Sequence, residues 1–215
     1  MAVIAAEWRK LGLPGIWLVA ALTVAGSWGL TALMSRSDSP EQALHTVPGF
    51  AVLGFILLGV MAATGEYAGR QIATTCTAMP RRLPVLAAKL LTVTATLAIA
   101  ATPAAGGMRL LVPDVECSVP GVVTHFVAMG LMGYAAALVL RQLVPALTTA
   151  LVLLVLAGPV LQPLTRLVDW LPGSVGADLF APSPAHPVAE SAGALAGWVL
   201  GFWLIAGLVW VRRDA

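Results

Sequence analysis

Six stretches of this sequence run for 19 residues or more without an Asp, Glu, Lys or Arg side chain. An ionised group at the centre of a bilayer costs roughly 2.5–3.5 kcal/mol on the lenient insertion scale, so long uncharged stretches are where a chain can cross a membrane. The stretches lie between residues 10 and 36, 45 and 66, 89 and 109, and 116 and 141, then from 142 to 165 and from 191 to 211. The chain is therefore predicted to be an integral membrane protein.

Composition agrees with this prediction and limits the number of domains. Hydrophobic residues make up 59% of the chain and charged residues 10%, whereas about 25% of the residues in a soluble domain are charged. The net charge of +2 gives no reason to expect a nucleic-acid partner. A bilayer core of about 30 Å needs about 20 helical residues per crossing, so 215 residues allow six or seven crossings. We expect one transmembrane domain, 1–215.

The predicted fold class is an all-α integral membrane protein with six transmembrane helices. Backbone inside a bilayer must satisfy its own hydrogen bonds, and the uncharged stretches lack the alternating pattern of a β-barrel. Lys89 falls within the third span and is expected to extend its amine to the interface. Pro103 and Pro159 are expected to bend helices near their outer ends. The predicted spans are 14–34, 48–64, 85–107, 120–140, 145–162 and 191–211.

Basic residues predict the orientation of these spans. With both termini in the cytoplasm, nine Lys and Arg residues lie on the inner side and three on the outer side. This asymmetry follows the positive-inside rule and agrees with an even number of crossings. Cys76 and Cys117 would then lie on opposite sides of the bilayer and remain free thiols.

Three segments outside the spans are also expected to be helical. Residues 1–12 place Met1, Ile4, Trp8 and Leu11 at helical spacing, which favours a helix lying in the inner interface. The segment 163–190 has five prolines among apolar and aromatic residues, which favours short re-entrant or surface helices on the outer side.

The third segment, 65–80, is the longest predicted cytoplasmic loop. Ala68, Ile72, Cys76 and Met79 recur at helical spacing, and a proline ends the pattern before the basic pair Arg81 and Arg82. Glu66 can pair with Arg70 one turn later. We therefore expect an amphipathic helix that contacts another protein. The alternative is a charged loop that only sets the topology.

The sequence shows no catalytic or cofactor-binding motif. Both lysines precede leucine, so the phosphate-binding loop of an ATPase is absent, as are the motifs of metalloproteases and serine hydrolases. His125 is the only histidine within a span, and we expect it to hydrogen-bond between helices rather than to bind a substrate. The three histidines do not have metal-ligand spacing. We predict that the chain is not an enzyme and binds no metal or cofactor itself.

Small and hydroxyl-bearing residues mark candidate helix contacts. Gly193, Gly197 and Gly201 recur every four residues, which allows close helix packing. Packing within the same chain is favoured over a contact between subunits. Threonine and serine faces in the first and third spans could line a cavity, but bonding to their own helix backbone is the favoured interpretation. These residues are Thr23, Ser27, Thr31, Thr92 and Thr96, together with Thr148.

The segment from Gly65 to Lys89 carries a local motif. It reads Gly65, Glu66 and Tyr67, then Ile72 with Thr74 and Thr75, then Pro80, Arg81 and Arg82, with Lys89 entering the third span. Together with Glu7, Trp8, Arg9 and Lys10 near the N-terminus and the six spans, this pattern resembles the permease subunits of type 2 ATP-binding-cassette exporters, especially small bacterial ones.

The resemblance implies a bacterial inner-membrane half-transporter. Two permease chains, as a homodimer or a heterodimer, would form the pathway, and two separate ATPase subunits would bind ATP and magnesium on the cytosolic side. The 65–80 helix would be the coupling helix that contacts the ATPase. Its contact residues would be Glu66, Tyr67, Arg70, Ile72, Cys76, Met79, Arg81 and Arg82. The alternative is a non-transporting scaffold, immunity or sensor subunit with the same fold. The substrate cannot be inferred from the sequence.

Overall fold

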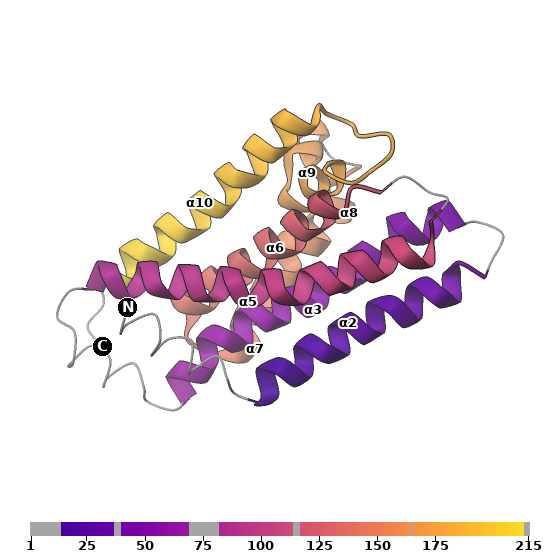
Figure 1. Ribbon diagram of the computed structural model, residues 1–215. Coiled ribbons are helices and arrows are strands. Elements are labelled where there is room, and N and C mark those ends of the chain that lie inside the picture. Colours follow the sequence, from indigo (N-terminus) through magenta and orange to yellow (C-terminus); the bar gives the residue numbers. More distant parts are fainter. Residues whose placement is uncertain (1–13, 37–39, 69–81, 114–116, 164, 213–215) are drawn as a thin grey trace.

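A computed structural model describes residues 14–36, 40–68, 82–113, 117–163 and 165–212. These residues form helices joined by loops, and none of them lies in a strand (Figure 1). The elements are α2 (Pro14–Met34), α3 (Pro40–Ala68), α5 (Arg82–Leu111), α6 (Val119–Leu140), α7 (Leu143–Leu151), the π-helical turn η1 (Val152–Leu156), α8 (Ala157–Leu161), the 3-10 helix η2 (Arg166–Trp170), α9 (Pro172–Asp178) and α10 (Val188–Arg212).

Six helical segments are long and apolar enough to cross a membrane, as the sequence predicts. They are Pro14–Met34, Thr46–Gly65, Val85–Leu111, Val119–Leu140, Leu143–Leu161 and Val188–Arg212. The fifth consists of α7, η1 and α8 in succession. The start of α2 and the end of α10 lie toward the same end of the bundle (Figure 1), as an even number of crossings requires. The short helices predicted within 163–190 are also present, as η2 and α9.

Two helices are longer than predicted. α3 continues to Ala68, so residues 65–68, which we expected in a separate helix, belong to the same helix as the second span. α5 begins at Arg82 and ends at Leu111. At its C-terminal end the Arg109 guanidinium donates to the carbonyl of Pro113 at 2.6 Å, a favourable place for a cation because helix-end carbonyls lack partners. The predicted interfacial helix, 1–12, lies outside the described residues.

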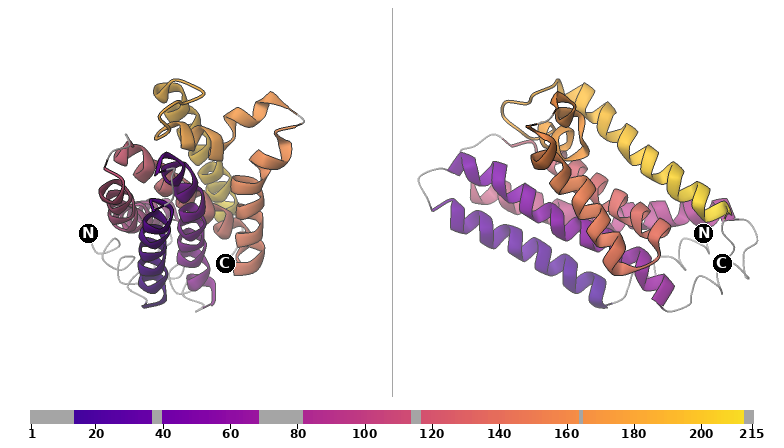
Figure 2. Two further views of the ribbon diagram at one scale, coloured as in Figure 1. Left: turned by 90° about the vertical axis from the view of Figure 1, so that its right-hand side faces the viewer. Right: turned by 180° about the vertical axis from the view of Figure 1, so that it is seen from behind.

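α6 is the central helix of the bundle (Figure 2). Most of its residues are buried, and it contacts α3, α5, α7, α9 and α10. The backbones of α6 and α3 meet closely, because a Cβ on Gly59 would collide with the Gly130 carbonyl oxygen. A Cβ on Gly133 would come within 2.9 Å of the Ile56 carbonyl oxygen. Glycines on both helices thus permit the close approach that packing in a membrane requires.

α2 attaches to the bundle through specific polar and glycine contacts. The Trp28 indole N–H donates to the Pro103 carbonyl at 2.9 Å, and its ring occupies the place that a Cβ on Gly107 would take. The hydroxyls of Thr23, Ser27, Thr31, Thr92 and Thr96 each donate to a carbonyl three or four residues earlier in their own helix. The predicted bonds to the helix backbone are therefore present, and Thr23 and Ser27 also line a cavity of about 210 Å³ between α2 and α3.

The fifth span is interrupted by a π-helical turn. The Ala157 N–H donates to the Val152 carbonyl, five residues earlier. Three residues after the end of this turn comes Pro159, which has no N–H and whose ring would crowd the Val155 carbonyl in a regular α-helix. A wider turn immediately before the proline relieves that crowding. The disturbance expected at Pro159 thus takes the form of a local change of helix type.

The side chain of Lys89 is enclosed by the protein, close to the end of α10. Its side chain is 1% exposed, and its Nζ lies 6.0 Å from the centroid of the Trp210 ring on α10. An ammonium group beside an aromatic face gains electrostatic energy from the ring quadrupole. The Lys89 side chain thus links α5 to the C-terminal part of α10.

The close contact of α3 with α6 gives a first prediction. Gly59→Ala places a methyl group against backbone that cannot move aside, and such overpacking costs about 1–3 kcal/mol. We expect a lower unfolding temperature for the purified variant in detergent, measured by thermal denaturation. Gly29→Ala, at an exposed helix glycine with open space around its Cβ, is the matched control. Equal unfolding temperatures for the two variants would contradict the packing described.

Candidate functional site

The predicted ATPase-contact residues lie where the second span ends and the third begins. The backbone of Glu66 and Tyr67 belongs to the last turn of α3, and Arg82 is the first residue of α5. The described ends of α3 and α5 thus hold the two ends of the segment 69–81. The remaining predicted residues, Arg70, Ile72, Cys76, Met79 and Arg81, lie outside the described residues.

The glycine face of α10 has open space around it in the part of the chain that the structure describes. A Cβ at Gly193, Gly197 or Gly201 would meet nothing within 4 Å. Among the described residues, no helix packs closely against this face, so its packing within the same chain stays a prediction. Helix contact is mediated instead by Gly59 and Gly130, because those glycines face another backbone. The α10 face is open at the surface of the chain.

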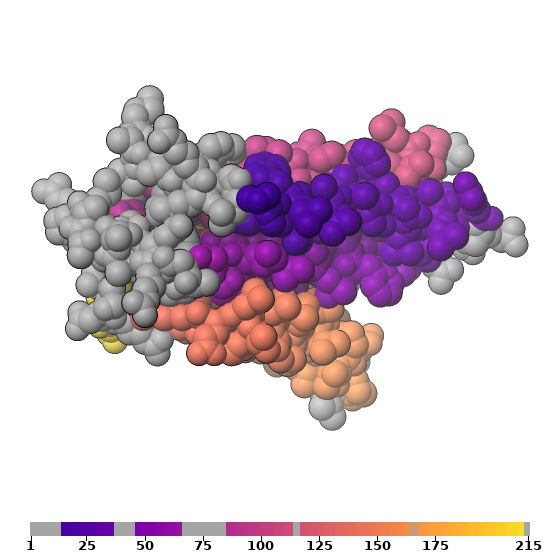
Figure 3. All heavy atoms as spheres, turned by 90° about the horizontal axis from the view of Figure 1, so that it is seen from below, coloured from indigo at the N-terminus to yellow at the C-terminus, as the bar shows by residue number. Residues whose placement is uncertain are grey.

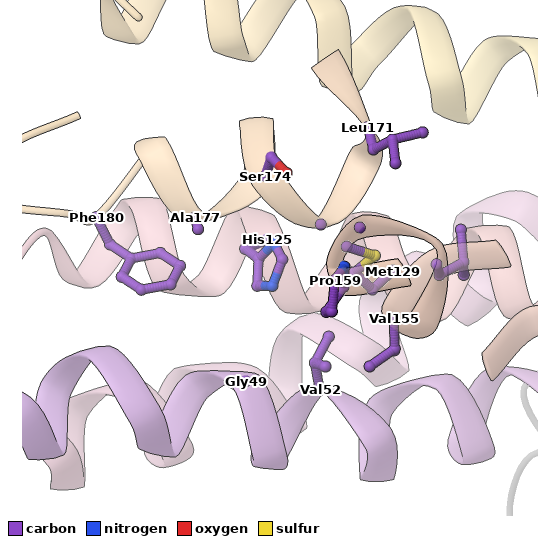
Figure 4. A pocket seen from close by; sticks show the side chains of 13 residues that line it. Gly49, Val52, His125, Met129, Val155, Pro159, Leu171, Ser174, Ala177 and Phe180 are labelled. Carbon is purple, nitrogen blue, oxygen red and sulfur yellow. The ribbon is translucent and has the colours of Figure 1, made fainter. Parts of the chain in front are cut away.

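A cavity of about 240 Å³ lies between α3, α6, η1, α8 and α9. We call it the outer cavity, because it lies at the end of the bundle that the basic residues predict to face outward. Val52, His125 and Met129 contribute side chains from α3 and α6, and Ser174 and Phe180 contribute from α9 and the residues after it. Figure 4 shows His125 between Ser174 and Ala177 on one side and Val52 on the other. The cavity is thus formed by residues that lie far apart in the sequence.

His125 is the polar centre of the outer cavity. It is 4% exposed, and its Nδ1 has no hydrogen-bond partner among the described residues. The expected hydrogen bond between helices is therefore not found there. Nδ1 instead packs against Gly176, where a Cβ would collide with it. Phe180 lies 5.6 Å from the imidazole, centroid to centroid. An imidazole in such surroundings can bind a partner that the chain itself does not supply.

The outer cavity adjoins an apolar groove of about 550 Å³ between α3 and the α7–η1 segment. Gly49 and Val155 line both. The rest of the groove is formed mainly by Phe50, Leu53 and Leu151. Figure 3 shows the face of the molecule on which α3 and the α7–η1 segment lie side by side. The groove on this face and the outer cavity are therefore adjacent.

A second apolar groove, of about 490 Å³, lies between α6, the fifth span and α10. Trp198, Phe202 and Ile205 line it from α10, and Leu153 and Ala157 line it from the fifth span. At its outer end the Trp198 indole donates to the Trp170 carbonyl at 2.8 Å. This bond connects η2 to α10 and holds the groove open between them.

The outer end of the chain is held together by Asp178, at the end of α9. One of its carboxylate oxygens accepts from the Ala185 N–H at 2.9 Å. The other accepts from the Ser191 hydroxyl at 3.1 Å and lies 3.1 Å from His186 Nδ1. Ser191 thus donates to the carboxylate, whereas an activated nucleophile would bond to the imidazole. The arrangement anchors α9 to the start of α10.

Sequence reasoning missed most of the outer cavity. His125 stood out as the only histidine within a span, but the glycine that receives its ring, Gly176, gave no local signal. In the part of the chain that the structure describes, no group of three or more His, Cys, Asp and Glu side chains could hold a metal ion. No protein-family model matches the sequence, and no curated protein matches it at a significant level.

The open glycine face of α10 gives a second prediction. Gly197→Leu adds a side chain where the chain leaves space, so the unfolding temperature of the isolated chain should correspond to a change within about 0.5 kcal/mol. Thermal denaturation beside Gly59→Ala measures this. A loss of stability as large as that of Gly59→Ala would show that α10 packs differently. Cross-linking of the same variant reports separately whether a second chain covers the face.

Cys117, in the loop before α6, gives a third prediction. Burial raises the pKa of its thiol above the usual range, and the positive charge of Arg109 offsets part of that rise. Because the thiolate is the reactive form, alkylation should be slow at neutral pH and should accelerate as the pH increases through and above the ordinary cysteine range. The rate of maleimide labelling in a Cys76→Ser background tests this, with the unfolded variant as reference. Labelling as fast as in the unfolded chain at pH 7 would contradict it.

Proposed function

We propose that this chain is the membrane-spanning permease subunit of a bacterial type 2 ATP-binding-cassette exporter. The observation that carries the proposal is the motif from Gly65 to Lys89, which lies between the second and third spans. In such exporters this segment transmits ATP-driven movement from a separate ATPase to the membrane helices. Both ends of the segment are rigidly connected here, because α3 continues into it and α5 begins directly after it.

The architecture supports this assignment. Six helices can cross a membrane, and the short helices η2 and α9 connect the fifth to the sixth at the end opposite to the described termini (Figure 1). Large apolar side chains remain exposed on α2, the fifth span and α10. These faces are available to lipid and to a second permease chain, with which this chain would form the pathway. The bacterial inner membrane, with both termini in the cytoplasm, is the proposed location.

The energy source would be a partner subunit. Because the sequence lacks a phosphate-binding loop, ATP and magnesium would bind to an ATPase on the cytosolic side, with two copies per permease dimer. In the coupling segment an apolar ridge of Ile72, Cys76 and Met79 would fit a groove on that ATPase. The charges of Glu66 and Arg81 would fix its position, since complementary charges determine register at an interface.

Charge reversal tests the proposal. An ATPase with a phosphate-binding loop, encoded beside this chain, is co-purified with wild type and with Glu66→Lys or Arg81→Glu. We expect at least about a tenfold loss of ATPase binding, because close interfacial charge pairs couple by about 1.5 kcal/mol or more. The ATP turnover of the complex should lose its dependence on the permease. Asp169→Lys, an exposed charge reversal in η2, is the matched control.

The outcomes separate the proposal from its alternative. Unchanged pull-down and unchanged ATP turnover in both variants would overturn the coupling role. A stable complex with the ATPase that moves no substrate, in vesicles assayed for export, would favour the scaffold, immunity or sensor role.

A further inference from the structure

We propose that the outer cavity is a binding site for a small, neutral, mostly apolar molecule that carries one hydroxyl group. The ligand reaches it from the membrane through the groove between α3 and the α7–η1 segment. Three observations carry the inference: a buried imidazole that lines the cavity and has no hydrogen bond among the described residues, a cavity large enough for an aromatic ligand, and an apolar groove that adjoins it. The inference goes beyond the permease assignment and does not depend on an ATPase.

The imidazole determines the polar part of the ligand. A buried polar group normally has a hydrogen-bond partner, and the described residues supply none for either nitrogen of the His125 ring. Since Nδ1 packs against Gly176, Nε2 is the ring nitrogen that faces the cavity. A hydroxyl group can either donate to this nitrogen or accept from it, so it suits both tautomers of a neutral imidazole. Ser174 adds a second hydroxyl to the cavity lining.

The remaining lining determines that the ligand is uncharged. Among the described residues, none that lines the outer cavity or the adjoining groove is an Asp, Glu, Lys or Arg. A carboxylate or an ammonium group would therefore lose its hydration without gaining a counter-charge. Anionic lipid headgroups and cationic drugs are excluded from the site on this ground.

The volume and the side chains determine the apolar part. A cavity of ~150 Å³ lined by apolar side chains binds benzene, and the outer cavity measures about 240 Å³. A benzene ring with a branched alkyl substituent fits this space. Met129 and Phe180 line it, and thioether and aromatic groups both pack favourably on aromatic rings. An alkylphenol is the simplest molecule that combines these features.

The path into the cavity passes a glycine and the π-helical turn. Gly49 is exposed and lines both the cavity and the groove, so no side chain at that position closes the connection. On the other side of the connection stands Val155, within η1. π-helical turns occur frequently at functional sites because they alter the direction of side chains. Entry through this apolar groove requires a ligand that is soluble in the bilayer.

Photoaffinity labelling of the full chain in proteoliposomes tests the proposal. The probe is an alkylphenol with a diazirine group, and cross-linked peptides are identified by mass spectrometry. We expect labelling of α3, α6 and α9 around the outer cavity. 4-tert-Butylphenol should compete at about tenfold lower concentration than tert-butylbenzene, which lacks the hydroxyl, because one hydrogen bond to a buried group is worth about this factor.

Two variants and one control make the test specific. His125→Phe preserves the ring volume and removes the nitrogen, so the two competitors should become equally potent. Gly49→Leu fills the connection between groove and cavity and should reduce labelling about tenfold or more. Gly29→Leu makes the same change at an exposed glycine of α2 with open space around it, and it should label like wild type.

The proposal is overturned if both competitors are equally potent in the wild-type chain. It is also overturned if Gly49→Leu labels like Gly29→Leu, or if cross-links are spread evenly over the lipid-facing helices. Should His125→Phe fail to fold, the two competitors on wild type and the glycine pair still decide the question. Because no ATPase is present, a negative result here leaves the permease assignment to its own test.

Discussion

The backbone contact between α3 and α6 is the interaction on which the rest of the bundle depends. Lipid tails are as apolar as leucine side chains, so helices in a bilayer associate through close packing rather than through exclusion of water. At Gly59 that packing is limited by the backbone of α6, and at Gly130 by the Leu97 side chain and the Phe55 carbonyl oxygen. α6 in turn carries His125 near one end and Tyr134, stacked 5.6 Å from Trp203, nearer the other. The glycine-mediated contact of α3 with α6 thus positions both the outer cavity and the contact between α6 and α10.

The membrane spans could be predicted because the free-energy cost that determines them is large and depends only on the residues of each span. A charge within the bilayer is costly wherever it occurs, so uncharged stretches mark the helices within a few residues. Glycine packing was not predictable in the same way. Gly197 and Gly59 look alike in sequence, yet only Gly59 faces another backbone. Which face of a helix is covered depends on the neighbouring helices, and α10 leaves its glycine face open.

The outer cavity could be predicted from the sequence only in part, for the same reason. His125 was conspicuous as a polar residue within a span, but its surroundings come from α9, some fifty residues later in the chain. Proline and glycine in that segment indicated short helices, and short helices are present. They could not indicate that Gly176 would receive the imidazole. The residues that line a cavity are brought together from distant parts of the sequence, whereas the position of a helix follows from its own residues.

The π-helical turn rotates the second half of the fifth span around the helix axis relative to the first half. A π turn takes in one residue more than an α turn, which sets all later side chains back by about 100° around the axis. Ala146, Ala150 and Leu154 form one buried line along the first half of the span, and no residue of α8 continues it. The two halves of the span are therefore short helices whose buried faces point in different directions. A single helical wheel drawn for 143–161 would therefore assign the second half to the wrong neighbours.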